Sequence, residues 1–175
     1  MIKISNLSKH FILHNQNSAV IPVMDQAEFS VAEGECVALV GQSGAGKSTL
    51  MRMIYGNYLA HNGAIWIGET NVVGATAREI IDLRRKTLGY VSQFLRVVPR
   101  VPTRDVVAEV YDYPALLLDE PTASLDVKNR SIVLGLVESA KARGAAIIGI
   151  FHDEAARDQV CDRVIDVTQY TPKAA

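Results

Sequence analysis

Apolar and polar residues alternate in the first part of the chain. Ile2 and Ile4 alternate with polar residues, and residues 27–31 repeat the pattern before a turn at residues 33–34. A period of two is typical of strands that bury only one face. The pattern therefore predicts an antiparallel β layer at the N-terminus.

Continuous apolar runs replace this alternation further along the chain. The runs at residues 36–40, 115–118 and 145–151 are typical of strands buried on both faces of a sheet. Because segments with helical spacing separate these runs, we expect an α/β fold with a mostly parallel core sheet. Further strands are expected at residues 64–67, 88–91 and 164–167, and further helices at residues 50–54, 103–110, 128–142 and 154–160.

One helix has a clear start signal at Thr76. Glu79 stands three positions later and completes a capping box, in which each residue bonds the backbone N–H of the other. Ile80, Ile81 and Leu83 follow and supply an apolar face. We therefore expect a helix that begins at Thr76 and packs on the core through these three residues.

Length and charge narrow the classes of function. A chain of 175 residues can bury one substantial core, so we expect a single domain over residues 1–175. The formal net charge is −1 and no basic stripe is present, so nucleic acid is not an expected partner. Cys36 and Cys161 lie far apart without metal-ligand spacing, and we expect both to be reduced structural thiols.

The apolar segments are too short for a membrane or export signal. Residues 1–11 contain no continuous apolar stretch, so no signal peptide is expected. The longest apolar run, residues 145–151, is far below the roughly 20 residues of a transmembrane helix. The expected location is cytoplasmic, and any membrane contact would go through a partner.

The glycine-rich segment at residues 41–48 carries the clearest chemistry. It reads Gly-Gln-Ser-Gly-Ala-Gly-Lys-Ser and lies between a predicted buried strand and a predicted helix, which is the context of a phosphate loop. Backbone N–H groups surround phosphate oxygens, Lys47 adds a positive charge, and Ser48 binds Mg²⁺. A flexible glycine turn is the alternative. The predicted ATP-binding residues are Gly41, Gln42, Ser43, Gly44, Ala45, Gly46, Lys47, Ser48 and Thr49.

Two carboxylates, Asp119 and Glu120, follow the apolar run at residues 115–118. Ligands of open α/β sheets collect at the carboxyl ends of the strands. Asp119 is a candidate metal ligand, and Glu120 is a candidate to polarise an attacking water. A solvated strand end is the alternative. Together with the phosphate loop, the pair indicates phosphoryl transfer to water.

The segment at residues 120–126, Glu-Pro-Thr-Ala-Ser-Leu-Asp, resembles the one that marks ATP-binding cassette (ABC) ATPases among phosphate-loop proteins. The resemblance implies an ABC-type P-loop NTPase fold. It also implies that Lys47, Glu120 and His152 act in catalysis, with His152 at the end of the next buried strand. A structural helix cap is the alternative for His152.

The same resemblance implies three further roles. Gln93 would sense Mg²⁺ and the γ-phosphate, and Phe11 would stack on adenine. Ser124 and Asp126 would face a partner subunit, in a homodimer or a paired ABC subunit. The alternatives are a solvated loop residue for Gln93, a core aromatic for Phe11 and a helix cap for Asp126.

Within the family, three segments look most like subunit L of the carbon-phosphorus lyase system: residues 92–100, 113–126 and 149–154. An insertion at residues 12–22 lengthens the first hairpin in the same way. This resemblance implies other soluble lyase subunits as partners. A transmembrane permease is the alternative partner, and a truncated ATP-binding module that does not hydrolyse ATP is a third reading.

The resemblance breaks at the junction of residues 110 and 111. The family has a helical subdomain with a Leu-Ser-Gly-Gly-type signature between Gln93 and Asp119, and this sequence has neither. We favour disorder of this segment as the explanation, because both flanks match without drift. An engineered deletion and a natural truncation are the alternatives. Without the signature, we expect ATP binding to persist and hydrolysis to be lost or very slow.

Overall fold

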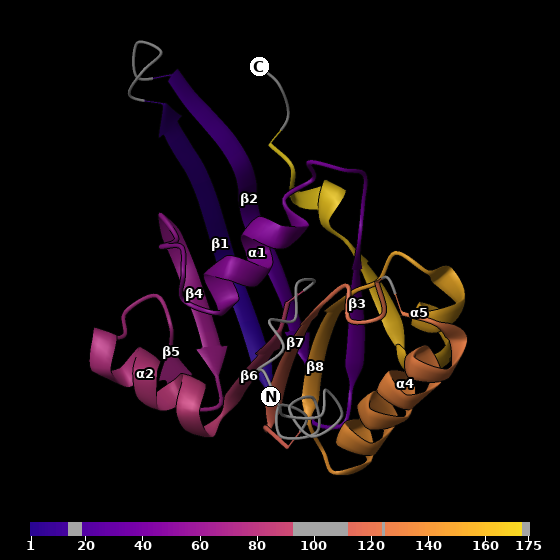
Figure 1. The fold of residues 1–175 in the computed structure, drawn as a ribbon. Helices are drawn as coiled ribbons and strands as arrows, with labels where there is room; N and C mark the ends of the chain where they lie inside the picture. The colour runs from indigo at the N-terminus through magenta and orange to yellow at the C-terminus, as the bar shows by residue number, and fades with distance from the viewer. Residues whose placement is uncertain (14–18, 93–111, 124, 173–175) are drawn as a thin grey trace.

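The N-terminal strands form an antiparallel sheet in the computed structural model, which describes residues 1–13, 19–92, 112–123 and 125–172 (Figure 1). The order across the sheet is β2-β1-β4-β5. This arrangement confirms the predicted N-terminal β layer. The strands are β1 (Ile2–Leu13), β2 (Ala19–Val31), β4 (Asn62–Ile67) and β5 (Thr70–Asn71).

The second sheet is parallel in every pairing that the structure describes, and its order is β6-β7-β8-β3-β9. Its central strands, β7, β8 and β3, are almost wholly buried because both faces of the sheet are covered. The predicted mostly parallel core is thus confirmed. The strands are β3 (Cys36–Val40), β6 (Leu88–Val91), β7 (Ala115–Asp119), β8 (Ala146–Ile150) and β9 (Arg163–Asp166).

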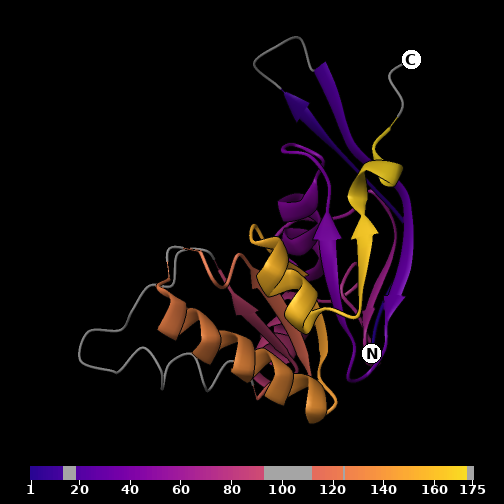
Figure 2. The same cartoon turned by 90° about the vertical axis from the view of Figure 1, so that its right-hand side faces the viewer.

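The parallel sheet divides the apolar interior into two cores, and helices cover both of its faces. Helix α1 (Lys47–Ile54) lies between the two sheets, whereas α4 (Val127–Ala142) and α5 (Glu154–Val160) cover the opposite face of the parallel sheet (Figures 1 and 2). Alternate residues of β7 point into different cores. Leu117 packs in the core with α1, and Leu116 packs with α4 and α5. The β7 strand therefore has no solvent-exposed face.

Helix α2 (Ala77–Lys86) begins as predicted. The Glu79 carboxylate accepts a hydrogen bond from the backbone N–H of Thr76 at 2.7 Å, and the Thr76 hydroxyl accepts one from the Glu79 N–H at 3.3 Å. Leu83 is buried and Ile80 packs against the core. Ile81 is 50% exposed, so its predicted core position is wrong. It lies about 100° around the helix from Ile80 and faces away from the core.

Several features differ from the predictions or lie beyond them. Strand β5 and the 3₁₀ helix at Val167–Tyr170 carry no apolar period and were not predicted. The strand expected at residues 145–151 is shorter by one residue at each end. The helix expected at residues 103–110 lies outside the described residues. Among the helices described, none is both long enough and apolar enough to cross a membrane.

Candidate functional site

The glycine-rich loop joins β3 to α1 in a conformation that requires glycine. Gly46 caps the N-terminus of α1 with a left-handed backbone, at a φ of +95°. A Cβ atom at this position would lie 3.1 Å from Val23 Cγ1, so the loop also needs the small residue for close approach. The helix has no side-chain cap, and the N–H groups of its first turn are left for water or for an anion.

Lys47 lies across this loop. Its Nζ atom donates hydrogen bonds to the backbone carbonyl oxygens of Gly41, at 2.6 Å, and of Gln42, at 3.1 Å. The side chain is therefore folded back over the N-terminal end of its own helix. An ammonium group placed there adds a full positive charge to the partial positive charge of the helix end.

Asp119 and Glu120 lie where predicted, at the carboxyl end of β7. The hydroxyl of Tyr90 on neighbouring β6 donates a hydrogen bond to Asp119 Oδ2 at 3.0 Å. Burial, and then the negative charge of Asp119, raise the pKa of Tyr90 above its ordinary value, so this hydroxyl remains a donor at neutral pH. Glu120 has a left-handed backbone, with a φ of +52°, and its N–H bonds the Ile150 carbonyl at 2.9 Å.

His152 follows β8, directly before α5. Asp153, not His152, caps this helix, since its carboxylate accepts hydrogen bonds from the N–H groups of Ala155 at 2.9 Å and Ala156 at 3.3 Å. The helix-cap alternative for His152 is therefore wrong. Arg130 of α4 forms an ion pair with the same Asp153 carboxylate, so α4 helps to fix the chain next to His152.

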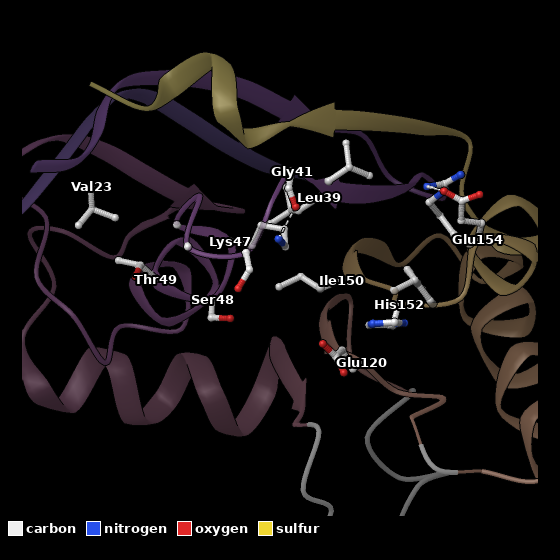
Figure 3. A pocket seen from close by; sticks show the side chains of 16 residues that line it. Val23, Leu39, Gly41, Lys47, Ser48, Thr49, Glu120, Ile150, His152 and Glu154 are labelled. Carbon is white, nitrogen blue, oxygen red and sulfur yellow. Dashed lines mark hydrogen bonds and ion pairs between the residues drawn. The ribbon is translucent and has the colours of Figure 1, made fainter. Parts of the chain in front are cut away.

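One pocket of about 720 Å³ is lined by Lys47, Ser48, Glu120 and His152. Three predicted residues, Gln42, Ala45 and Asp119, are not among those that line it. Figure 3 shows Lys47 and Ser48 on one side of it, and Glu120 and His152 on the other. They meet because β3, β8 and β7 are adjacent parallel strands, whose carboxyl ends share one edge of the sheet. The pocket also has lining residues that the sequence analysis missed: Val23, Leu39, Val40, Ile150, Phe151, Glu154 and Arg157.

Different signals could have found some of the missed residues. Arg157 and Glu154 follow His152 at helical spacing, so a search along the predicted helix would have included them. Val23 reaches the loop from the antiparallel sheet, where it contacts Gly46. That contact depends on how the two sheets pack, and no local pattern indicates it.

The remaining predicted residues lie apart from these pocket residues or outside the described chain. The Phe11 ring packs edge-to-face on Tyr58, with centroids 5.6 Å apart, and is not among the residues that line the pocket. Asp126 caps α4 by accepting a hydrogen bond from the Asn129 N–H at 2.7 Å. Gln93 and Ser124 lie outside the described residues.

The comparison with protein families decides which family this chain belongs to. Residues 24–114, more than half of the chain, match the family described as ABC transporter. The chain belongs to the ABC transporter family. The likeness to solved structures agrees, since the ABC cassette MJ0796, in a dimeric post-hydrolysis state bound to ADP and Pi, superposes with a TM-score of 0.80. The comparison covers 96% of this chain and 95% of MJ0796 at 18% identity, and it shows the ABC-type P-loop NTPase fold.

Curated ABC relatives match at higher identity over parts of their length. The lipoprotein-releasing system ATP-binding protein LolD of Coxiella burnetii is 38% identical over 99 residues, which are 57% of this chain and 41% of LolD. The hemin import ATP-binding protein HmuV of Nocardia farcinica is 32% identical over 192 positions. That alignment covers 81% of this chain and 66% of HmuV. The chain thus spans less than two thirds of either relative.

The HmuV alignment also contains a large gap in this ABC chain. It runs over 192 positions, whereas 81% of 175 residues is about 142, so about 50 positions have no counterpart here. In this alignment HmuV therefore has about 50 positions that this ABC sequence lacks.

Ser48 and Asp119 of this ABC protein carry donors that Mg²⁺ prefers. Ser48 supplies a neutral hydroxyl within the pocket, and Asp119 supplies a carboxylate at the strand end. Mg²⁺ binds oxygen ligands of these two kinds, retains several waters and completes its shell with phosphate oxygens. The residues present therefore fit a magnesium nucleotide.

Proposed function

We propose that this chain is the ATP-binding subunit of an ABC membrane transporter, and that it binds Mg-ATP and hydrolyses the γ-phosphate bond. The single observation that carries the proposal is the pocket in which Lys47 and Ser48 face Glu120 and His152 (Figure 3). The names of the relatives support the transporter role, because LolD belongs to a releasing system and HmuV to an import system.

Each pocket residue has a distinct proposed role. The loop N–H groups and Lys47 bind the phosphate oxygens, and Ser48 and Asp119 would hold Mg²⁺, which would neutralise phosphate charge. Glu120 accepts a proton from the attacking water while His152 hydrogen-bonds the γ-phosphate. The left-handed backbone at Glu120 supports its role as the proton acceptor. A strained backbone of this kind is kept mainly at functional sites, where the surrounding structure holds it in place.

The transporter hypothesis also gives the proposed partners of the chain. The chain acts at the cytoplasmic face of a membrane, beside a transmembrane permease, and pairs with a second ABC subunit. Ser124 and Asp126 face that second subunit, and Gln93 senses Mg²⁺. Phe11 supplies the adenine contact if nucleotide binding moves it from Tyr58. Asp126 thus faces the second subunit and also caps α4.

A second candidate is the ATP-binding subunit of a carbon-phosphorus lyase system. The long first hairpin favours it, because β1 and β2 remain paired out to Leu13 and Ala19 and extend beyond the rest of the molecule (Figure 1). A third candidate is a module that binds ATP without turnover. The alignment gap of about 50 positions favours that reading, because the signature of the family would lie in such a segment.

Glu120→Gln tests the catalytic proposal. We expect the intact protein, once its mass shows that the signature segment is present, to hydrolyse ATP, and the variant to bind ATP with unchanged affinity while losing about 100-fold or more in turnover. Glu154→Gln removes another carboxylate that lines the pocket and serves as the matched control, with turnover within about twofold of wild type. Equal losses in both variants would contradict the role of Glu120. Binding without turnover in the wild type would support the third candidate.

The partner is tested by purifying the full chain from its native cells under mild detergent. An integral membrane protein in the complex supports the transporter, and soluble lyase subunits support the second candidate. The intact mass of the same sample is measured first. A mass about 5 to 6 kDa above the 19.1 kDa of the sequence would reveal a hidden segment of about 50 residues.

A further inference from the structure

The two cysteines, 125 positions apart in the sequence, meet in the fold. Cys36 begins β3 and Cys161 ends α5, and their Sγ atoms lie 3.5 Å apart. This proximity follows from the pairing of β3 with β9, in which Val37 lies opposite Arg163. Cys36 and Cys161 are also the only cysteines of the chain, so each has no other intramolecular partner for a disulfide.

The backbone around the thiols is held by hydrogen bonds from both directions. The Cys36 N–H donates to Asp162 Oδ2 at 2.8 Å, and the Asp162 N–H donates to the Cys36 carbonyl at 2.8 Å. Lys141 of α4 donates to the Val160 carbonyl and to Asp162 Oδ1, both at 2.8 Å. The segment that carries Cys161 is therefore fixed beside β3.

The two thiols have different environments. The hydrogen bond between them and the nearby charge of Lys141 lower the pKa of Cys161, whereas the same hydrogen bond and burial raise the pKa of Cys36. Cys161 is partly exposed and Cys36 is fully buried. The more acidic thiol is thus the one that a reagent can reach, and the buried thiol is its neighbour.

We propose that Cys36 and Cys161 form a redox modification site, at which a low-molecular-weight disulfide oxidises the two thiols to one intramolecular disulfide. The Cys161 thiolate attacks the reagent, forms a mixed disulfide and expels one reagent thiolate. The Cys36 sulfur then attacks Cys161 Sγ, the bond between Cys161 and the reagent breaks, and the departing reagent thiolate takes up the Cys36 proton. The cysteines lose two electrons and two protons, and the reagent becomes two thiols.

Only a small movement separates the two forms. The sulfurs must approach from 3.5 Å to about 2.05 Å, and Cys161 follows a short helix as its C-cap and is only partly buried. The bond would connect the strand that leads into the phosphate loop with the helix that follows His152. Because the disulfide closes a loop of more than 100 residues, we expect it to raise the Tm by about 5 to 10 °C.

The test treats the full chain with oxidised glutathione under native conditions. The proposal predicts a mass decrease of about 2 Da, a single peptide that links Cys36 with Cys161, and reversal by dithiothreitol. Two glutathione adducts on one chain, a disulfide between two chains, or two unreacted thiols would each overturn it. The Tm of oxidised wild type is measured with and without dithiothreitol, and an unchanged Tm would contradict the proposed link between α5 and β3.

Two single variants test the order of the steps. Cys36→Ser should accumulate one glutathione adduct on Cys161, because the resolving thiol is missing. Cys161→Ser should remain unmodified, because Cys36 is buried. The opposite pattern would overturn the assignment of Cys161 as the attacking thiol. If either variant fails to fold, the mass and peptide map of the wild type still decide whether the disulfide forms.

Discussion

The hydroxyl of Tyr90 donates a hydrogen bond to Asp119 Oδ2 across the β6–β7 pair, at 3.0 Å. We predict that Tyr90→Phe lowers the apparent affinity for Mg²⁺ by about tenfold, because it removes the partner that orients Asp119, the proposed metal-binding carboxylate. Titration of nucleotide binding with Mg²⁺ measures this change. Nucleotide binding without the metal should remain unchanged.

A neighbouring tyrosine provides the control. The Tyr55 ring lies 5.0 Å from the Tyr90 ring, between centroids, and Tyr55→Phe removes a hydroxyl from the same aromatic pair. This variant should keep the Mg²⁺ dependence of the wild type. A similar loss in both variants would mean that the bond from Tyr90 to Asp119 is not responsible.

Gly135→Ala should stabilise the protein. Gly135 lies inside α4, and an added Cβ atom would meet no atom within 4 Å. Alanine in a helix interior is favoured over glycine by about 0.5–1 kcal/mol. Thermal unfolding should show a rise in Tm of about 2–4 °C. Gly144→Ala is the control, because an added Cβ atom would also meet open space there but the backbone has a φ of +94°. This variant should lower the free energy of unfolding by about 1–2 kcal/mol.

Variants of Asp126 separate its two proposed roles. Asp126→Ala removes the cap of α4 and should lower the free energy of unfolding by about 1 kcal/mol, as measured with urea. Asp126→Asn keeps an oxygen acceptor and should retain this stability. If Asp126 also faces a partner subunit, the asparagine variant will lose ATP turnover at unchanged stability. Wild-type turnover in that variant would limit Asp126 to capping.

The capping box of α2 should make stability depend on pH. Hydrogen bonds from Thr76 lower the pKa of Glu79 below its usual 4.5. A carboxylate with a lowered pKa stabilises the fold above the unfolded-state pKa, and this contribution is lost as the pH falls through the folded-state value. The difference in Tm between wild type and Glu79→Gln should therefore be larger at pH 7 than at about pH 3. Glu69→Gln, at an exposed turn, is the control for the loss of one carboxylate elsewhere on the surface.

Local patterns predicted the elements whose apolar period is uninterrupted. The strand Leu88–Val91 and the helix Glu154–Val160 have the predicted bounds, because turn or capping residues flank each of them. The short strand Thr70–Asn71 has no apolar residue and exists only because it pairs with β4. Its presence depends on a neighbour, which a single-sequence pattern does not contain.

The individual motifs of the candidate site could be predicted from the sequence, but their arrangement in space could not. The loop with Lys47 and the strand end with Glu120 each have a local motif. Their meeting depends on the strand order β7-β8-β3, which places the ends of three distant segments side by side. The contact of Phe11 with Tyr58 and the contact between the thiols are also long-range, and neither leaves a signal in spacing or composition.

The strand order also sets the sequence of events during synthesis. The antiparallel sheet uses strands from the first 71 residues, so it can form while the rest of the chain is being made. Strand β3 has to wait, because its two neighbours, β8 and β9, lie more than 100 residues further on. Until they emerge, an apolar strand has both edges open and is prone to aggregate. The phosphate loop is thus among the first parts of the protein to be translated and among the last to take its final form.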